Sequence, residues 1–178
     1  MDFTTSPVTE FKKVTKVKNE RKNRKVILYI GRIEKYKGVD YLIRVLPKLS
    51  EEYVLEIVGK GPYKAEITKL ARKFGVLNRI TFYQDLSRDE LIQRYANADV
   101  FVLLSKYEAF GLSVAEALAA GVPCIVASEA ALKEWVDGKN VFGVRYPIDL
   151  DELAKLISQV AGKRVRGIEV PSWDSVVE

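Results

Sequence analysis

The strongest constraint on this 178-residue chain is a regular alternation of short apolar runs and segments of helical periodicity, which starts at Val26. The apolar runs are rich in β-branched residues, as buried strands are: VILYI (26–30), YVLEIVG (53–59), RITFY (79–83), DVFVLL (99–104), VPCIVA (122–127) and, more weakly, VFGVRY (141–146). Helical patterns cover 38–50, 63–75, 88–97, 112–120, 131–136 and 149–160. Because the runs are continuously apolar, we expect strands that are covered on both faces. The pattern predicts an α/β fold with a doubly wound, mainly parallel six-stranded sheet and helices on both faces.

The positive charge of the chain lies before the first strand. The net charge is +5, and residues 10–25 alone carry eight basic and two acidic residues. We therefore divide the chain into a basic, linker-like segment, 1–25, and a domain, 26–178, in which basic and acidic residues balance. For residues 12–25 the alternatives are a solvated linker, contact with an anionic membrane surface and contact with an acidic partner. No aromatic stacking pattern or recognition helix points to nucleic acid, so no nucleic-acid partner is expected.

The residue types that are absent narrow the possible chemistry. The chain has no histidine and one cysteine, Cys124, which excludes histidine catalysis, an internal disulfide and a cysteine-rich zinc site. Asp149-Leu150-Asp151 has the D-x-D spacing of some metal sites, but it opens a predicted helix, where aspartate is favoured as the N-cap. We expect no metal and no cofactor. Without an apolar span or a signal peptide, we expect a cytoplasmic protein, peripheral to a membrane if residues 12–25 bind one.

Two loops that follow predicted strands carry the candidate binding residues. After the first strand, Gly31 would let a ligand approach the backbone, and the cations of Arg32 and Lys37 suit a diphosphate. After the fourth strand, Glu108 precedes a helix start with unpaired amides, and Glu116 lies within that helix. Spacing alone leaves open whether Glu116 is a ligand or an exposed helix residue. Ligands of such sheets bind at the carboxyl ends of the strands, so these loops form the predicted site.

Together, GRIEKYKG (31–38) and EAFGLSVAEALAAGVPCIVAS (108–128) resemble the C-terminal half of a GT-B glycosyltransferase of the retaining family 4 group. Glu108 and Glu116 match the E-x7-E motif of that family, and the resemblance runs from Val26 to about Ile157. It implies a Rossmann-like, nucleotide-sugar-binding domain of an enzyme that transfers a sugar from a nucleoside-diphosphate donor to an acceptor.

The resemblance also implies a role for each candidate residue. Arg32 and Lys37 would bind the donor diphosphate, Glu116 the ribose hydroxyls, and Glu108 the transferred sugar. The remaining donor contacts that it implies are backbone amides and glycines: Phe110, Gly111, Leu112 and Ser113 beside sugar and phosphate oxygens, and Gly59 and Gly61 near the base.

The chain departs from the family pattern in three segments, one of which is DGKNVFGV (137–144), where Val141 replaces the last glycine of a D-G-x-N-G pattern. The family often has a glycine within the stretch 82–85, and G-G-x-P-E where this chain has Ala130-Ala131-Leu132-Lys133-Glu134. We expect the side chains of Ala131 and Leu132 to narrow the approach of a donor.

The acceptor half of a GT-B enzyme is not recognised in this sequence. We therefore expect a missing acceptor domain or a separate acceptor subunit as the partner. The alternatives are a module that binds a nucleotide sugar without transferring it on its own, a subunit of a split glycosyltransferase, and a nucleotide-sugar epimerase.

Overall fold

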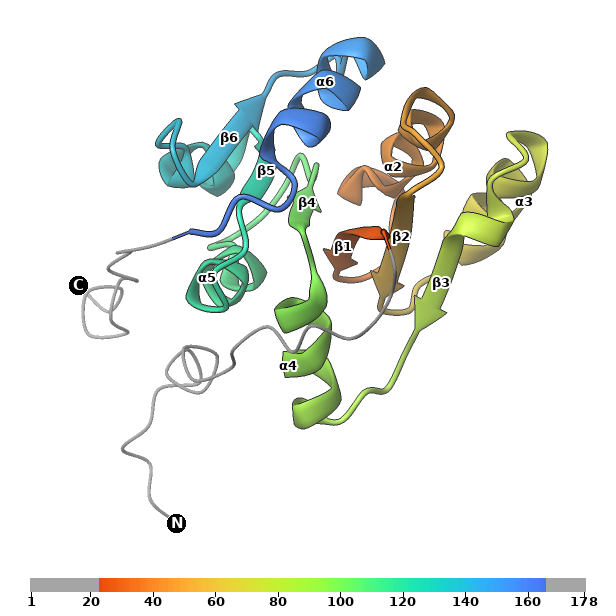
Figure 1. Cartoon of the computed structure of the whole chain (residues 1–178), viewed down its shortest axis with the longest axis horizontal. Coiled ribbons are helices and arrows are strands. Elements are labelled where there is room, and N and C mark those ends of the chain that lie inside the picture. Colours follow the sequence, from red (N-terminus) through yellow and green to blue (C-terminus); the bar gives the residue numbers. More distant parts are fainter. Residues whose placement is uncertain (1–22, 166–178) are drawn as a thin grey trace.

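The computed structural model describes residues 23–165, which form one six-stranded sheet (Figure 1). Most of the basic segment, including residues 12–22, lies outside the described residues. The strands are β1 (Lys25–Ile30), β2 (Tyr53–Val58), β3 (Ile80–Tyr83), β4 (Val100–Leu103), β5 (Cys124–Ala127) and β6 (Val141–Val144). Their order is β3-β2-β1-β4-β5-β6, and every neighbouring pair is parallel. The predicted doubly wound fold is confirmed.

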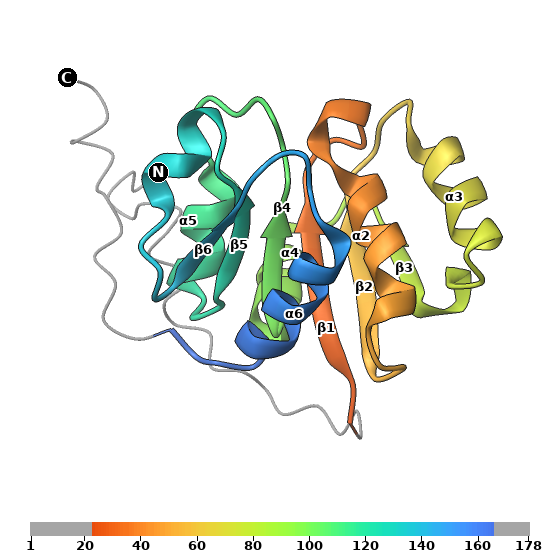
Figure 2. The same cartoon turned by 90° about the horizontal axis from the view of Figure 1, so that it is seen from above.

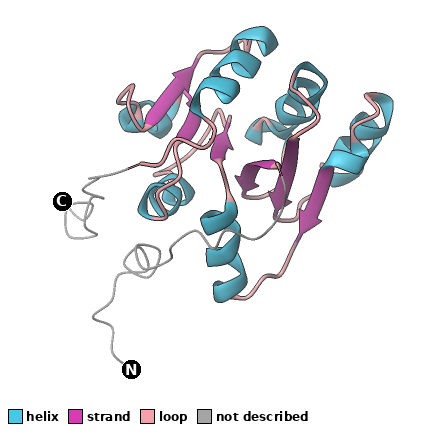
Figure 3. Cartoon of the chain, viewed as in Figure 1, coloured by secondary structure: helices cyan, strands magenta, loops and turns pink. Residues whose placement is uncertain are grey.

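Helices cover both faces of the sheet. The α-helices are α2 (Val39–Val45), α3 (Lys64–Lys73), α4 (Arg88–Asn97), α5 (Leu112–Ala119) and α6 (Leu150–Val160). The 3₁₀-helices are η1 (Lys35–Lys37), η2 (Leu46–Lys48), η3 (Leu77–Arg79) and η4 (Ala130–Trp135). Helices α2, α3 and α6 lie on one face of the sheet, and α4 and α5 lie on the other (Figures 1 and 3). Within residues 23–165, no helix is long and apolar enough to cross a lipid bilayer.

Two predicted helices differ in type from the observed ones. The pattern over 38–50 becomes α2 followed by η2, because Pro47 has no N–H to donate to the preceding helical turn. The pattern over 131–136 becomes the 3₁₀-helix η4. The apolar stripes are nevertheless buried as expected: Val39, Leu42 and Ile43 of α2 are at most 1% exposed.

The strand order reverses between β1 and β4. From β1 the chain builds outward through β2 and β3, and from β4 it builds in the other direction through β5 and β6. The loops at the carboxyl ends of two such strands diverge and leave a crevice, which is where sheets of this order bind ligands. Figure 2 shows the loops after β1, β4 and β6 along the upper edge of the sheet.

Backbone contacts hold the loops after β1 and β4 together at this crevice. Gly38 has a φ of 73°, and a Cβ placed there would lie 2.4 Å from the carbonyl oxygen of Leu104. The N–H of Lys106 donates to the carbonyl of Tyr36 at 3.1 Å. The two loops therefore approach each other more closely than any side chain at residue 38 would allow.

Replacing Gly38 with alanine should destabilise the domain far more than replacing Gly75. Both glycines have left-handed backbones, with φ of 73° and 67°, so both substitutions cost roughly 1 kcal/mol of strain. Only Gly38→Ala adds a backbone clash, because nothing lies within 4 Å of a Cβ on Gly75. We expect Gly38→Ala to lower the free energy of unfolding by at least about 3 kcal/mol and Gly75→Ala by about 1 kcal/mol in urea titrations. Equal losses would show that the contact at Gly38 is loose.

Candidate functional site

An ion pair between Lys37 and Glu108 lies at the crevice between β1 and β4. Lys37 ends η1 after β1, and Glu108 lies in the loop between β4 and α5, so each partner comes from one side of the crevice. Their side chains are only 14% and 17% exposed. A lysine ammonium has three N–H donors, so after its bond to Glu108 the Lys37 ammonium can still donate to an anion. The structure thus joins two of the predicted site residues directly.

The N-terminus of α5 follows Glu108 in the chain. Gly111 is the N-cap of α5, and the first turn of this helix carries no acidic residue that would offset its partial positive charge. The amides of Leu112 and Ser113 belong to this first turn, in which N–H groups have no intrahelical acceptor. The predicted amide donors therefore lie at a helix N-terminus, beside the loop that carries Glu108.

Trp135 fixes the loop before α5. Its indole N–H donates to the carbonyl of Phe110 at 2.8 Å, and the two rings meet edge to face with centroids 5.7 Å apart. Phe110 is thereby held by η4, a segment that the sequence places 25 residues away. No local sequence pattern connects Trp135 to Phe110, so this contact is not predictable from the sequence.

Glu116 is buried, which excludes the interpretation that it is an exposed helix residue. It is 9% exposed, and its Oε2 accepts a hydrogen bond of 2.8 Å from the hydroxyl of Tyr95 in α4. Burial raises the pKa of Glu116, while the Tyr95 hydroxyl and the charge of Arg88 act in the opposite direction. A buried carboxylate with a perturbed pKa beside a crevice is a candidate ligand group.

Tyr95 is a further candidate site residue, which the sequence analysis did not predict. Its ring is fully buried, and its hydroxyl contacts Glu116. The available signal was a tyrosine in the apolar stripe of a predicted helix, in line with Leu91 and Ile92, because a buried tyrosine hydroxyl needs a partner.

Arg32 is not brought into contact with Lys37. Its guanidinium pairs with Glu34 at 3.2 Å, and its side chain is 62% exposed. It therefore lies at the surface, free to move toward a ligand but not fixed as Lys37 is.

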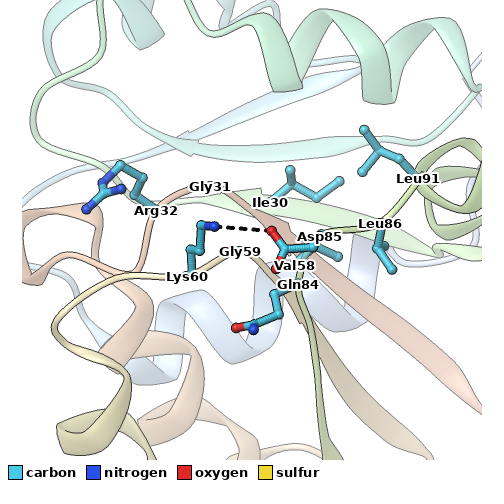
Figure 4. A pocket seen from close by; sticks show the side chains of 10 residues that line it. All are labelled: Ile30, Gly31, Arg32, Val58, Gly59, Lys60, Gln84, Asp85, Leu86 and Leu91. Atoms are coloured by element: carbon cyan, nitrogen blue, oxygen red, sulfur yellow. Dashed lines mark hydrogen bonds and ion pairs between the residues drawn. The ribbon is translucent and has the colours of Figure 1, made fainter. Parts of the chain in front are cut away.

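A cavity of about 360 Å³ opens beside Arg32, at the carboxyl ends of β1, β2 and β3. Figure 4 shows the residues that line it, including Gly31 and Gly59 and an ion pair of 3.1 Å between Lys60 and Asp85. The apolar part of the lining consists of Ile30, Val58, Leu86 and Leu91. Lys60 lies between the predicted residues Gly59 and Gly61, and Asp85 ends the stretch 82–85, but the sequence pattern predicts no role for either side chain.

The two glycines after β2 have different surroundings. A Cβ on Gly59 would lie 1.8 Å from the carbonyl oxygen of Gly31, and one on Gly61 would lie 2.3 Å from that of Ile33. Both glycines therefore let the loops after β1 and β2 pack backbone against backbone. Gly59 also lines the cavity, whereas Gly61 is not among the lining residues.

In the stretches 82–85 and 130–134, where the family often has glycine, one residue of each keeps a backbone conformation that favours glycine. Asp85 and Ala130 have φ of 54° and 47°, in the left-handed region that glycine adopts without strain. The expectation that Leu132 narrows the approach of a donor is wrong. Leu132 is fully buried and packs under Gly111, because its apolar side chain joins the core.

The D-x-D sequence caps a helix, as predicted. Asp149 accepts hydrogen bonds from the amides of Asp151 and Glu152 at 2.9 and 3.0 Å, and Asp151 pairs with Lys48 at 2.8 Å. In the part of the chain that the structure describes, no group of three or more His, Cys, Asp or Glu residues is arranged to hold a metal ion. Cys124 is buried within β5.

These features define a Rossmann-like domain with a partly buried cation and a helix N-terminus at its strand-order reversal. The chain belongs to the family of glycosyl transferases group 1, whose model matches residues 10–164. It is 36% identical to an uncharacterized glycosyltransferase of Methanocaldococcus jannaschii over 70% of this chain and 35% of that protein. It is also 36% identical to the glycogen synthase of Mycobacterium tuberculosis, over 75% of this chain and 33% of that protein.

The fold is shared with solved glycosyltransferase structures. HepE of Anabaena, in complex with UDP and glucose, matches with a TM-score of 0.71 and 26% identity over 77% of this chain and 38% of that chain. The present chain thus spans about a third of the length of the curated relatives described above.

Replacing Glu116 with glutamine should stabilise the domain at neutral pH. Because burial raises the pKa of Glu116, the native state binds its proton more tightly than the unfolded chain does. Native stability therefore falls as the pH rises from the ordinary pKa of a glutamate through the raised value. Glutamine avoids that loss and still accepts the Tyr95 hydrogen bond, so we expect a melting temperature a few degrees (~3 °C) higher at pH 7 and little difference at pH 4.

The control is Glu134→Gln, which alters an exposed glutamate and should leave the melting temperature unchanged at both pH values. A lower melting temperature of Glu116→Gln at pH 7 would show that the charge of Glu116 serves stability.

Proposed function

We propose that residues 26–178 form the donor-binding, C-terminal domain of a retaining glycosyltransferase of family 4. The observation that carries the proposal is the Lys37–Glu108 ion pair, held at the strand-order reversal beside the N-terminus of α5. An anion-binding cation, helix amides and a carboxylate at one crevice are the groups that a sugar diphosphate requires.

Each part of a nucleoside-diphosphate sugar can be assigned to one group of this site. The base enters the cavity of about 360 Å³ beside Gly31 and Gly59, the ribose hydroxyls reach Glu116, and the diphosphate lies between Lys37 and the α5 amides. The transferred sugar then meets Glu108. The UDP and glucose bound by HepE and the glycogen synthase relative support a nucleotide sugar as the ligand class.

The proposed chemistry is electrostatic. Breaking the bond between the anomeric carbon and the diphosphate leaves negative charge on the phosphate oxygens. In this proposal Lys37 and the amides of Leu112 and Ser113 stabilise that charge, and Arg32 turns from Glu34 to join them. Glu108 positions the sugar and does not attack it. The proposal assigns the positive charge to these groups and requires no metal or cofactor.

Transfer also requires an acceptor. We propose that a second domain or a separate subunit supplies the acceptor domain that completes the cleft, so that the present domain alone binds the donor without transferring its sugar. An assay of sugar transfer by the isolated domain distinguishes this arrangement from a domain that is active by itself.

The direct test is a thermal-shift screen of this chain against UDP-, GDP- and ADP-sugars. A ligand that binds only the native state at about 100 times its dissociation constant adds roughly 2.7 kcal/mol to the free energy of unfolding. We expect one base class to raise the melting temperature, and Glu116→Gln to abolish the rise. No shift with any of the three classes would refute the donor site.

Lys37→Met should weaken binding of the preferred nucleoside diphosphate at least about tenfold in calorimetry, because it removes one charged hydrogen bond worth roughly 1.5–3 kcal/mol. Lys35→Met is the matched control, since Lys35 is an exposed lysine of the same 3₁₀-helix and the proposed donor makes no contact with it. Equal affinity of the Lys37→Met and Lys35→Met variants would remove Lys37 from the site.

A further inference from the structure

A second cavity, of about 430 Å³, lies at the loops after β1 and β4 that carry Lys37 and Glu108, although neither of these two residues lines it. Four tyrosines from four separate segments line it: Tyr36 of η1, Tyr41 of α2, Tyr107 of the loop after β4 and Tyr146 of the loop after β6. The loops after β1, β4 and β6 lie along the upper edge of the sheet in Figure 2, and α2 begins near this edge and runs down over one face of the sheet. Tyr36 and Tyr107 directly precede Lys37 and Glu108, so this tyrosine cavity and the ion pair share the same two loops.

The deeper rings of the tyrosine cavity are fixed by contacts within the domain. Tyr146 donates a hydrogen bond of 2.5 Å to the carbonyl of Leu104 and meets Tyr41 edge to face at a centroid distance of 5.6 Å. The ammonium of Lys106 lies 4.7 Å from the centroid of the Tyr146 ring. This wall is preformed, so a ligand would bind without the cost of ordering it.

The outer rings are exposed. Tyr107 is 69% exposed and Tyr36 is 41% exposed, and their ring centroids lie 6.0 Å apart. Packing of the core does not explain two aromatic faces in water beside a binding crevice. Neighbouring exposed aromatic residues at a cavity are typical of a surface that binds a ligand or a partner.

Charged side chains form the rest of the lining: the carboxylates Glu34 and Asp40 and the lysines Lys35 and Lys106. Glu34 and Asp40 line the cavity, with side chains 27% and 21% exposed, and they pair with Arg32 and Arg44. A carboxylate has about four acceptor positions, so each retains capacity for hydroxyl donors after its arginine contact. The cavity thus combines aromatic faces with acceptors at their rim.

We propose that the tyrosine cavity binds a sugar ring of the acceptor. A pyranose presents C–H groups on its faces, which pack on tyrosine rings, and hydroxyls at its rim, which donate to carboxylates. The assignment to the acceptor rests on the proposed function, because an acceptor hydroxyl must reach the sugar held at Glu108. The tyrosine cavity is lined by the loop that carries Glu108, and it is separate from the cavity proposed for the base of the donor. An acceptor ring bound there would lie near the transferred sugar.

The test is saturation-transfer NMR on this chain with methyl glucoside, methyl mannoside and methyl galactoside, and with glycerol as an acyclic polyol. Concentrations of about 10 mM cover the roughly millimolar affinity expected of a single small ring. We expect transfer to at least one pyranoside, stronger at its ring C–H protons, and none to glycerol.

Tyr107→Ala should reduce the transfer at least about fivefold and leave the melting temperature unchanged, because Tyr107 is largely exposed. Phe74→Ala is the matched control, since Phe74 is an exposed aromatic residue, 38% accessible, at the end of α3 and does not line the cavity. It should leave the transfer intact.

Absence of transfer to every pyranoside, or transfer that persists in Tyr107→Ala, would overturn the sugar site. The same samples are then titrated with the nucleoside diphosphates. Nucleotide binding without pyranoside binding refutes this inference alone. Pyranoside binding without nucleotide binding refutes the donor function, and with it the assignment of the bound ring to an acceptor.

Discussion

The close approach of the loops after β1 and β4 is the constraint on which the rest of the site depends. Gly38 lets the first loop lie against the carbonyl of Leu104, and the N–H of Lys106 binds the carbonyl of Tyr36. Only because these backbones touch can Lys37 and Glu108 meet across the strand-order reversal. The same contact brings Tyr36 beside Tyr107, so that one packing arrangement builds both the ion pair and the neighbouring cavity.

Several residues of the candidate site have a burial or a backbone conformation that lowers the stability of the native state. Glu116 is buried with a raised pKa, and the Tyr95 hydroxyl compensates only part of its lost solvation. Asp85 and Ala130 adopt left-handed backbones, which are strained for residues with a Cβ. Such costs collect at ligand sites, where geometry matters more than local stability. Their position around one crevice supports a single site that extends from the cavity beside β1 to the N-terminus of α5.

The sequence predicts the fold well because its apolar runs are continuous, which requires a sheet covered on both faces, and this sheet is observed. The motif residues Lys37, Glu108 and Glu116 are also found at the predicted loops and helix. Tyr95 and Trp135 were not assigned to the site because they act through contacts across the fold, 21 and 25 residues from their partners. The expectation for Leu132 is wrong for the same reason: whether a side chain narrows a cleft or fills the core depends on packing, which spacing does not encode.

The measurement that tests the central claim most directly is a crystal structure of this chain with its preferred nucleoside diphosphate. We predict phosphate oxygens within hydrogen-bond distance of the Lys37 ammonium and of the amides of Leu112 and Ser113, with the ribose at Glu116 and the base in the cavity beside Gly59. A diphosphate bound away from the crevice between β1 and β4, with Lys37 still bonded only to Glu108, would contradict the account.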